Sequence, residues 1–150
     1  MPDTTTTPRR PIREGLLTGD LADTARIRLL GTRCATCGET ALGERATCPA
    51  CSAPSVTHVP LSDRGTLWTY TVVRYRPPGD YRGPEPFEPF GIGLVEVPEG
   101  VRVMSPIRCA PEALAIGMPL VFVPEVRTDP DGAEVVAFAF APAANGGRDD

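Results

Sequence analysis

Four cysteines form the pattern in this chain with the most specific chemistry. Cys34 and Cys37 make one C-x2-C pair, and Cys48 and Cys51 make a second pair after ten intervening residues. Each pair can turn both sulfurs inward from a tight turn, and two such turns together supply a tetrahedral thiolate shell. Gly38 follows the first pair, where such a turn often needs a residue that tolerates positive φ. The spacing therefore predicts a structural Zn²⁺ site in a zinc ribbon.

Two alternatives stand beside zinc at this point. The four cysteines could pair as two disulfides, or their thiolates could hold iron in a centre of the rubredoxin type. A closed shell of four thiolates has no open position for water or substrate. We therefore expect a metal here to fold the segment and not to catalyse.

The other side chains offer little for catalysis, because the chain has no lysine and a single histidine, His58. We interpret His58 as a hydrogen-bonded linker residue, since no orienting acid or nucleophile lies near it in sequence. Cys109 stands in an apolar setting and is predicted to be a buried, inert thiol and not a nucleophile. Glu85 and Glu88 are interpreted as rim charges and not as an acid/base pair. No residue of this chain is predicted to be catalytic.

The distribution of charge argues against nucleic acid as the ligand. The net charge is -4; residues 1–60 carry seven arginines and six acidic residues, whereas residues 61–150 carry eight arginines and thirteen acidic residues. A nucleic-acid-binding domain usually has a basic excess, because neutralising phosphates drives its affinity. No apolar run approaches the ~20 residues of a membrane span, and the N-terminus has no apolar signal region. We expect a cytoplasmic protein, a setting that favours metal over disulfides.

The pattern of elements predicts a mainly β protein, with an N-terminal rubredoxin-like zinc ribbon followed by a five-stranded OB-fold barrel. We expect disordered tails at 1–13 and 142–150, a ribbon with its preceding segment at 14–58, and an OB-fold domain at 59–141. Asp20 to Asp23 should cap a short helical turn, and 25–34 should form a strand that enters the first cysteine pair. The predicted barrel strands are 65–75, 91–97, 101–107, 119–126 and 133–140, with a helical turn in 109–118.

The segment 76–90, RPPGDYRGPEPFEPF, differs from the rest of the predicted barrel. It holds five prolines and two glycines in fifteen residues, together with Tyr81, Phe87 and Phe90. Prolines lower the entropy of a free loop and aromatic side chains supply contact area, so the segment is typical of a docking loop. The alternative is that its aromatic side chains fold back and plug the open end of the barrel. Arg82 is the best single anchor, because a guanidinium beside an aromatic ring suits an interface.

Taken together, these segments resemble a known family. The cysteine pairs, followed by GTLWTYTVVRY, PPGDYRGPEPFEPFGIGLVEVPEG and PEALAIGM, are similar to a family of acyl-CoA-associated proteins that combine a zinc ribbon with an OB-fold, formerly a domain of unknown function. The likeness runs from about Arg33 to Phe140, and the four cysteines match the family's metal ligands. The segment before the ribbon lacks the long helix of some relatives, which puts that part of the partner contact in doubt.

The resemblance implies a function for the whole chain. Members are small subunits that pair with thiolase-fold enzymes: thiolases, acyltransferases and retro-aldolases that cleave CoA thioesters. It implies a non-catalytic accessory subunit that supports its partner's active site and helps to bind CoA. The candidate partner- or CoA-binding residues are Arg74, Arg76, Tyr81, Arg82, Phe87 and Phe90.

The predicted strand 65–75 carries further candidate binding residues, and two other functions are considered for the chain. Trp68 and Tyr70 alternate on one strand and should share a face, as core filling or as a binding platform. Arg74 and Arg76 share that parity, and could meet a CoA phosphate, a partner carboxylate or only solvent. The alternative function is a single-stranded nucleic-acid-binding OB-fold. A self-sufficient acyl-CoA hydrolase is a third reading, for which the sequence offers no convincing nucleophile.

Overall fold

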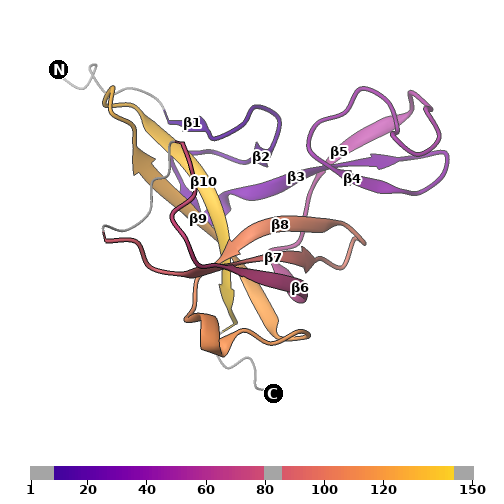
Figure 1. The fold of residues 1–150 in the computed structure, drawn as a ribbon. Helices are drawn as coiled ribbons and strands as arrows, with labels where there is room; N and C mark the ends of the chain where they lie inside the picture. The colour runs from indigo at the N-terminus through magenta and orange to yellow at the C-terminus, as the bar shows by residue number, and fades with distance from the viewer. Residues whose placement is uncertain (1–8, 80–85, 144–150) are drawn as a thin grey trace. The chain divides into compact units, whose positions relative to one another are not determined.

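The computed structural model describes residues 9–79 and 86–143, which divide into two compact units (Figure 1). The first unit spans Met1–Asp63 and Pro124–Phe138, and the second spans Arg64–Val123 and Ala139–Asp150. Among the described residues, no helix is long and apolar enough to cross a membrane.

The first unit contains a four-stranded sheet that carries both cysteine pairs. Its strands are β2 (Leu17–Thr18), β3 (Arg28–Cys34), β4 (Thr40–Leu42) and β5 (Val56–Pro60), and β3 pairs with each of the others. The predicted strand that enters the first cysteine pair is confirmed as β3. A 3-10 helix, η2 (Thr24–Arg26), precedes it, and the Asp23 side chain accepts a hydrogen bond from the Ala25 backbone N–H, as predicted.

Burial in this sheet is concentrated along β3 and at Ile27, the residue before it. Ile27 and Leu29 have almost no exposed surface. The buried Thr32 hydroxyl donates to the Gly43 carbonyl at 2.7 Å and accepts from the Arg45 backbone N–H at 3.0 Å. A Cβ at Gly31 would lie 2.6 Å from a methyl of Leu61, so a larger residue there would displace the Leu61 side chain. These contacts fix β3, and through it the position of Cys34.

Within the predicted N-terminal tail, Arg10–Pro11 form a short strand, β1, in the first unit. It pairs in parallel with β10 (Glu134–Pro142), with Arg10 opposite Val135. Arg10 also forms an ion pair with Asp129 at 2.8 Å, and Arg9 forms one with Glu134 at 2.9 Å. This part of the predicted tail therefore has pairing partners. Residues 1–8 and 144–150, predicted to be disordered, lie outside the described residues.

The predicted OB-fold barrel is confirmed. Its strands are β6 (Arg64–Val73), β7 (Phe90–Glu96), β8 (Arg102–Ile107), β9 (Pro119–Thr128) and β10. The six-stranded sheet has the order β1-β10-β8-β7-β6-β9, and a further pairing of β9 with β10 closes five of its strands into a barrel. The predicted helical turn between the third and fourth strands is a 3-10 helix, η3 (Pro111–Ala113), with Pro111 at its start.

On the inner face of β6–β8, the glycines of β7 lie against buried apolar side chains. A Cβ at Gly93 would lie 2.5 Å from a methyl of Leu67, and one at Gly91 would lie 2.6 Å from a methyl of Leu114. Leu67, Val95 and Val103 are fully buried. Neighbouring side chains therefore fill the space that the glycines leave, and β7 turns its larger side chains to the outer face.

A β-bulge in β6 corrects the expectation that Trp68 and Tyr70 share a face. Leu67 pairs with Val95, but Thr69 pairs with Leu94, so Trp68 is an extra residue in the strand. Directly opposed residues of paired strands lie on the same face. Tyr70 lies opposite Gly93 on the inner side, and its hydroxyl donates to the Leu114 carbonyl at 3.5 Å. Trp68 points outward and is 44% exposed.

Candidate metal centre

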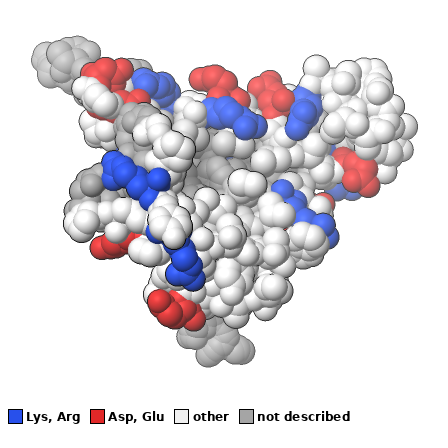
Figure 2. Space-filling view, viewed as in Figure 1, with Lys and Arg blue, Asp and Glu red and all other residues white. Residues whose placement is uncertain are grey.

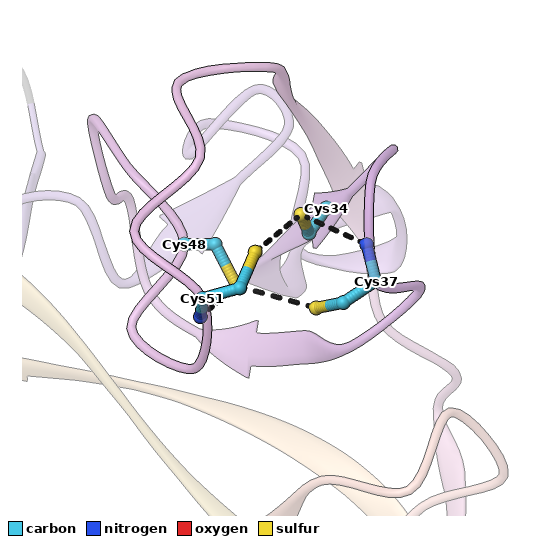
Figure 3. A group of neighbouring side chains, drawn as sticks. All are labelled: Cys34, Cys37, Cys48 and Cys51. Carbon is cyan, nitrogen blue, oxygen red and sulfur yellow. Dashed lines mark hydrogen bonds between the residues drawn. The ribbon is translucent and has the colours of Figure 1, made fainter.

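The two cysteine pairs fold into two turns with the same pattern of hydrogen bonds (Figure 3). In the first turn, Cys34 Sγ accepts from the backbone N–H groups of Thr36 at 3.3 Å and Cys37 at 3.4 Å. In the second, Cys48 Sγ accepts from Ala50 at 3.3 Å and Cys51 at 3.4 Å. Each turn thus supplies one sulfur held by two backbone donors and a second sulfur three residues later.

The residue after each pair has the same backbone conformation in both turns. The Gly38 N–H donates to the Cys34 carbonyl at 3.0 Å, and the Ser52 N–H donates to the Cys48 carbonyl at 2.8 Å. Their φ angles are 82° for Gly38 and 68° for Ser52, both in the left-handed region. The predicted positive φ of Gly38 is confirmed. The one at Ser52 was not predicted, because serine gives no signal for it.

The four sulfur atoms lie where one metal ion could bind them all. They are all within 4.8 Å of one another, and Cys34–Cys51 and Cys37–Cys48 are each 3.6 Å apart. An ion about 2.3 Å from four tetrahedral sulfurs would hold them about 3.8 Å apart, which these distances fit. A disulfide would need about 2.05 Å, and all four cysteines are free. The arrangement fits a single ion and not two disulfides.

The pKa values of the four thiols separate into two groups. Hydrogen bonds from the Cys37 and Thr36 backbone N–H groups lower the pKa of Cys34 to about 6, although burial opposes them. Those from Cys51 and Ala50 lower the pKa of Cys48 in the same way. The Glu39 backbone N–H lowers the pKa of Cys37, but burial and the neighbouring sulfurs outweigh it and raise that pKa to about 12. The pKa of Cys51 is also raised, because Cys34 Sγ and burial outweigh the Ala53 backbone N–H.

This grouping suits a metal site. Without an ion, four thiolates so close together would repel one another, and each turn favours ionisation at its first cysteine only. A bound divalent cation would compensate the charge of all four thiolates, which is the state that metal binding requires. The donor set is all sulfur, which suits zinc or iron, and four protein ligands leave no open position for substrate.

The other predicted site residues lie in or beside the segment 76–90. Arg74 and Arg76 are exposed where β6 ends. Phe87 and Phe90 are half-buried, and their rings form an edge-to-face pair with centroids 6.2 Å apart. The structure therefore brings these two aromatic side chains together. The two remaining candidates, Tyr81 and Arg82, lie outside the described residues, as does Glu85.

The two residues set aside as non-catalytic have ordinary surroundings. His58 is hydrogen-bonded as expected, with its Nε2 3.3 Å from the Arg45 carbonyl. It lies in β5, paired with Thr32, and not in a linker. Cys109 lies outside the cysteine cluster, and partial burial raises the pKa of its thiol, which disfavours the reactive thiolate.

The outer face of β6–β8 carries a set of residues that the sequence did not reveal. Ile92 and Leu94 of β7 face outward opposite Pro106 and Met104 of β8. The signal was the run GIGLVEV, in which glycines alternate with large apolar residues. It predicted a strand, but it did not indicate which set of residues faces outward.

The architecture defines a class of protein, in which a four-cysteine ribbon precedes an OB-fold barrel, and the comparisons agree with it. The family model described as the C-terminal OB-fold domain of ChsH2 matches residues 58–123. A solved structure titled an Ltp2-ChsH2(DUF35) aldolase is 30% identical, covering 77% of this chain and 84% of that chain with a TM-score of 0.56. This chain belongs to the DUF35 family.

Two curated relatives extend the comparison. A DUF35 domain-containing scaffold protein of Methanothermobacter thermautotrophicus is 29% identical over 121 residues, which are 78% of this chain and 88% of the relative. The benzoylsuccinyl-CoA thiolase subunit BbsA of Thauera aromatica is 26% identical over 114 residues, which are 75% of this chain and 74% of the relative. The resemblance seen in the sequence is thus confirmed, and of these relatives one is named a scaffold protein and the other a thiolase subunit.

Proposed function

We propose that this protein is a non-catalytic accessory subunit of a thiolase-fold enzyme that acts on acyl-CoA thioesters. The observation that carries the proposal is that this chain matches a thiolase subunit and a scaffold protein over about three quarters of its length. In this role the subunit supports its partner's active site and helps to bind CoA. The sparse set of catalytic side chains supports a scaffolding role, since the chain has no lysine and one histidine.

We propose zinc as the resident metal, bound by Cys34, Cys37, Cys48 and Cys51. An ion with four protein thiolates neither activates water nor polarises a substrate, so its contribution is to hold the ribbon folded. The proposal includes a ribbon at 14–58, an OB-fold domain at 59–141 and a cytoplasmic location, where thiols stay reduced and available to metal.

The partner contact is proposed to involve the segment 76–90. Phe87 and Phe90 already form an edge-to-face pair, so part of this aromatic surface is ordered before any partner binds. Ordering that is complete before binding lowers the entropy cost of association. Arg74, Arg76, Tyr81 and Arg82 remain candidates for contacts to the partner or to CoA phosphates.

Co-purification with a thiolase-fold protein tests the proposal. The protein encoded beside this gene that has a thiolase fold is co-expressed with this chain, and the mixture is analysed by gel filtration and by thioester turnover. We expect one complex whose activity falls when this subunit is left out. Separate elution, with the same activity with and without this subunit, would contradict the proposal.

A pair of substitutions makes the test specific for the segment. Changing Arg82 and Phe87 together to alanine should weaken assembly at least tenfold and leave one metal per chain. The matched control changes Arg127 and Ile116 to alanine, because both are exposed and lie outside the segment. Assembly of this control should equal that of wild type.

The charge distribution disfavours the alternative function, single-stranded nucleic-acid binding. On the face shown in Figure 2, blue and red side chains are interspersed among the described residues and form no continuous basic groove. An oligonucleotide titration at low salt distinguishes the two functions: tight binding with a steep salt dependence would favour the nucleic-acid reading.

A further inference from the structure

We infer that the outer face of β6–β7–β8 is the surface on which the thiolase-fold partner docks, continuous with the segment 76–90. The inference rests on the proposed function and adds to it the location of the contact. We call this surface the outer strip; its residues are Trp68, Phe90, Ile92, Leu94, Met104 and Pro106.

The strand register places these side chains on one face. Leu94 pairs with Met104, and Ile92 pairs with Pro106. Phe90, Ile92 and Leu94 alternate along β7 with Gly91, Gly93 and Val95, which are buried. Because residues two apart on a strand share a face, the larger residues of β7 all lie on the outer side.

This placement of apolar side chains on the outer side is the reverse of what an exposed antiparallel sheet usually shows. Such a sheet normally has apolar residues on its core side and polar residues on its solvent side. Here β7 places glycines inside and Ile92 and Leu94 outside, and Met104 is 68% exposed on the neighbouring strand. Thr69 and Thr71 of β6 lie opposite Leu94 and Ile92, so the apolar part of this face is formed mainly by β7 and β8. Exposed apolar side chains gathered in this way are typical of an interaction site.

One end of the outer strip carries a pre-arranged group of interface-type side chains. The Arg102 guanidinium carbon lies 3.9 Å from the centre of the Trp68 ring. The Arg102 Nε also contacts the Glu96 carboxylate at 3.4 Å, and Glu96 pairs with Arg102 across the strands. Tryptophan and arginine are enriched among residues that dominate binding energy, and their fixed geometry here lowers the entropy lost on association.

The other end of the strip leads directly into the proposed docking segment. Phe90 is the first residue of β7, and its ring forms the edge-to-face pair with Phe87. The strip therefore includes part of the described aromatic end of the proposed docking segment, Phe87 and Phe90. This overlap selects the partner proposed for the segment as the occupant. That partner must present an apolar patch over Leu94 and Met104 and a hydrogen-bond acceptor near Arg102.

An exposure-matched pair of substitutions tests the inference. Met104 lies in the strip and Ile116 lies outside it, in the connection between η3 and β9, and each is 68% exposed. Met104→Asp places a carboxylate in the proposed contact, where losing water without gaining a partner is costly. The affinity of each full-length variant for the co-purified thiolase-fold protein is measured by isothermal titration calorimetry.

We expect the Kd to rise at least 100-fold for Met104→Asp and to change less than threefold for Ile116→Asp. Metal content and thermal midpoint should match wild type in both. Trp68→Ser, at the other end of the strip, provides a second variant and should raise the Kd at least tenfold.

The possible failures are distinguishable. If wild type and all three variants bind the thiolase-fold protein equally well, the strip is not the contact surface, and the proposed function stands. If wild type does not bind that protein, the proposed function and this inference both fall. If sedimentation shows that wild type alone is a dimer that Met104→Asp dissociates, the strip binds a second copy of this chain, and the inference is overturned.

Discussion

The two cysteine turns and the core of the second unit maintain their structures by different physical means. Between residues 35 and 60 only Gly43 and Cys48 are buried, so this part of the ribbon has almost no apolar core. In the second unit Leu67, Val95 and Phe140 are fully buried, and Phe140 forms an edge-to-face pair with Phe122 at 5.8 Å.

The cysteine turns and the core of the second unit therefore depend on different sources of stability. Burial of apolar surface contributes roughly 25 cal/mol per Å², so the barrel can stabilise itself. The two cysteine turns lack that contribution, so we expect an ion bound by their four thiolates to hold them folded. We therefore expect changes at the cysteines to act on the ribbon alone, and changes in the core of the second unit to act on the barrel alone.

The largest expected effect is at the metal. Serine at Cys34 removes a buried ligand that also accepts two backbone hydrogen bonds, so metal content should fall to well below one ion per chain. Metal binding supplies on the order of 10 kcal/mol to the folding of small zinc domains, so the ribbon should unfold when it is lost. Hydrogen exchange should rise across residues 35–55 and stay unchanged in β6–β8.

Serine at Cys109 is the matched control, because this cysteine lies outside the cluster. It should leave both the metal content and the exchange of the ribbon at wild-type levels. A Cys34→Ser protein with full metal content and a protected ribbon would contradict the comparison.

A smaller effect is expected in the core of the second unit. Phe140→Ala removes a fully buried ring and its contact with Phe122, and should lower the free energy of unfolding of the barrel by about 3–5 kcal/mol. Urea unfolding followed by Trp68 fluorescence measures this. The control is Tyr75→Ala, which changes a side chain that is 85% exposed and should cost less than about 0.5 kcal/mol. Loss of metal from Phe140→Ala would show that the two regions are coupled.

The elements with strong local signals were predictable from sequence. The cysteine spacing predicted the cluster of four sulfurs that the structure brings together, and dense β-branched and aromatic runs located all five barrel strands to within a few residues. The proline at Pro111 and the capping residue Asp23 likewise located the two 3-10 helices. Each of these signals is set by a residue's own backbone preference or by its nearest neighbours along the chain.

The features that sequence did not predict depend on partners distant along the chain. The bulge at Trp68 is defined only by its register with β7, and alternation alone wrongly placed Trp68 and Tyr70 on the same face. Strand β5 (Val56–Pro60) forms because it pairs with β3. Its own sequence, which contains a proline and a histidine, gives no strong strand signal. The outward position of Leu94 follows from glycines that fit closely against Leu67 and Leu114, which no local pattern reveals.

The smallest effect we predict compares the two cysteine turns with each other. Gly38 and Ser52 occupy equivalent positions, with φ angles of 82° and 68°. A Cβ at Gly38 would meet nothing within 4 Å, so Gly38→Ala adds only backbone strain, about 1–2 kcal/mol. Ser52→Gly relieves similar strain but adds chain entropy to the unfolded state, and should change stability by less than about 1 kcal/mol in the favourable direction. Metal release by a competing chelator measures both effects.

Ser52→Ala separates backbone strain from the loss of the hydroxyl, because alanine at this φ is strained like serine. It should release metal at the wild-type rate or slightly faster, whereas Gly38→Ala should release it several times faster. Equal release from Gly38→Ala and wild type would mean that the left-handed conformation is not strained in the metal-bound ribbon. The equivalence of the two turns would then rest on their hydrogen bonds to Cys34 and Cys48 alone.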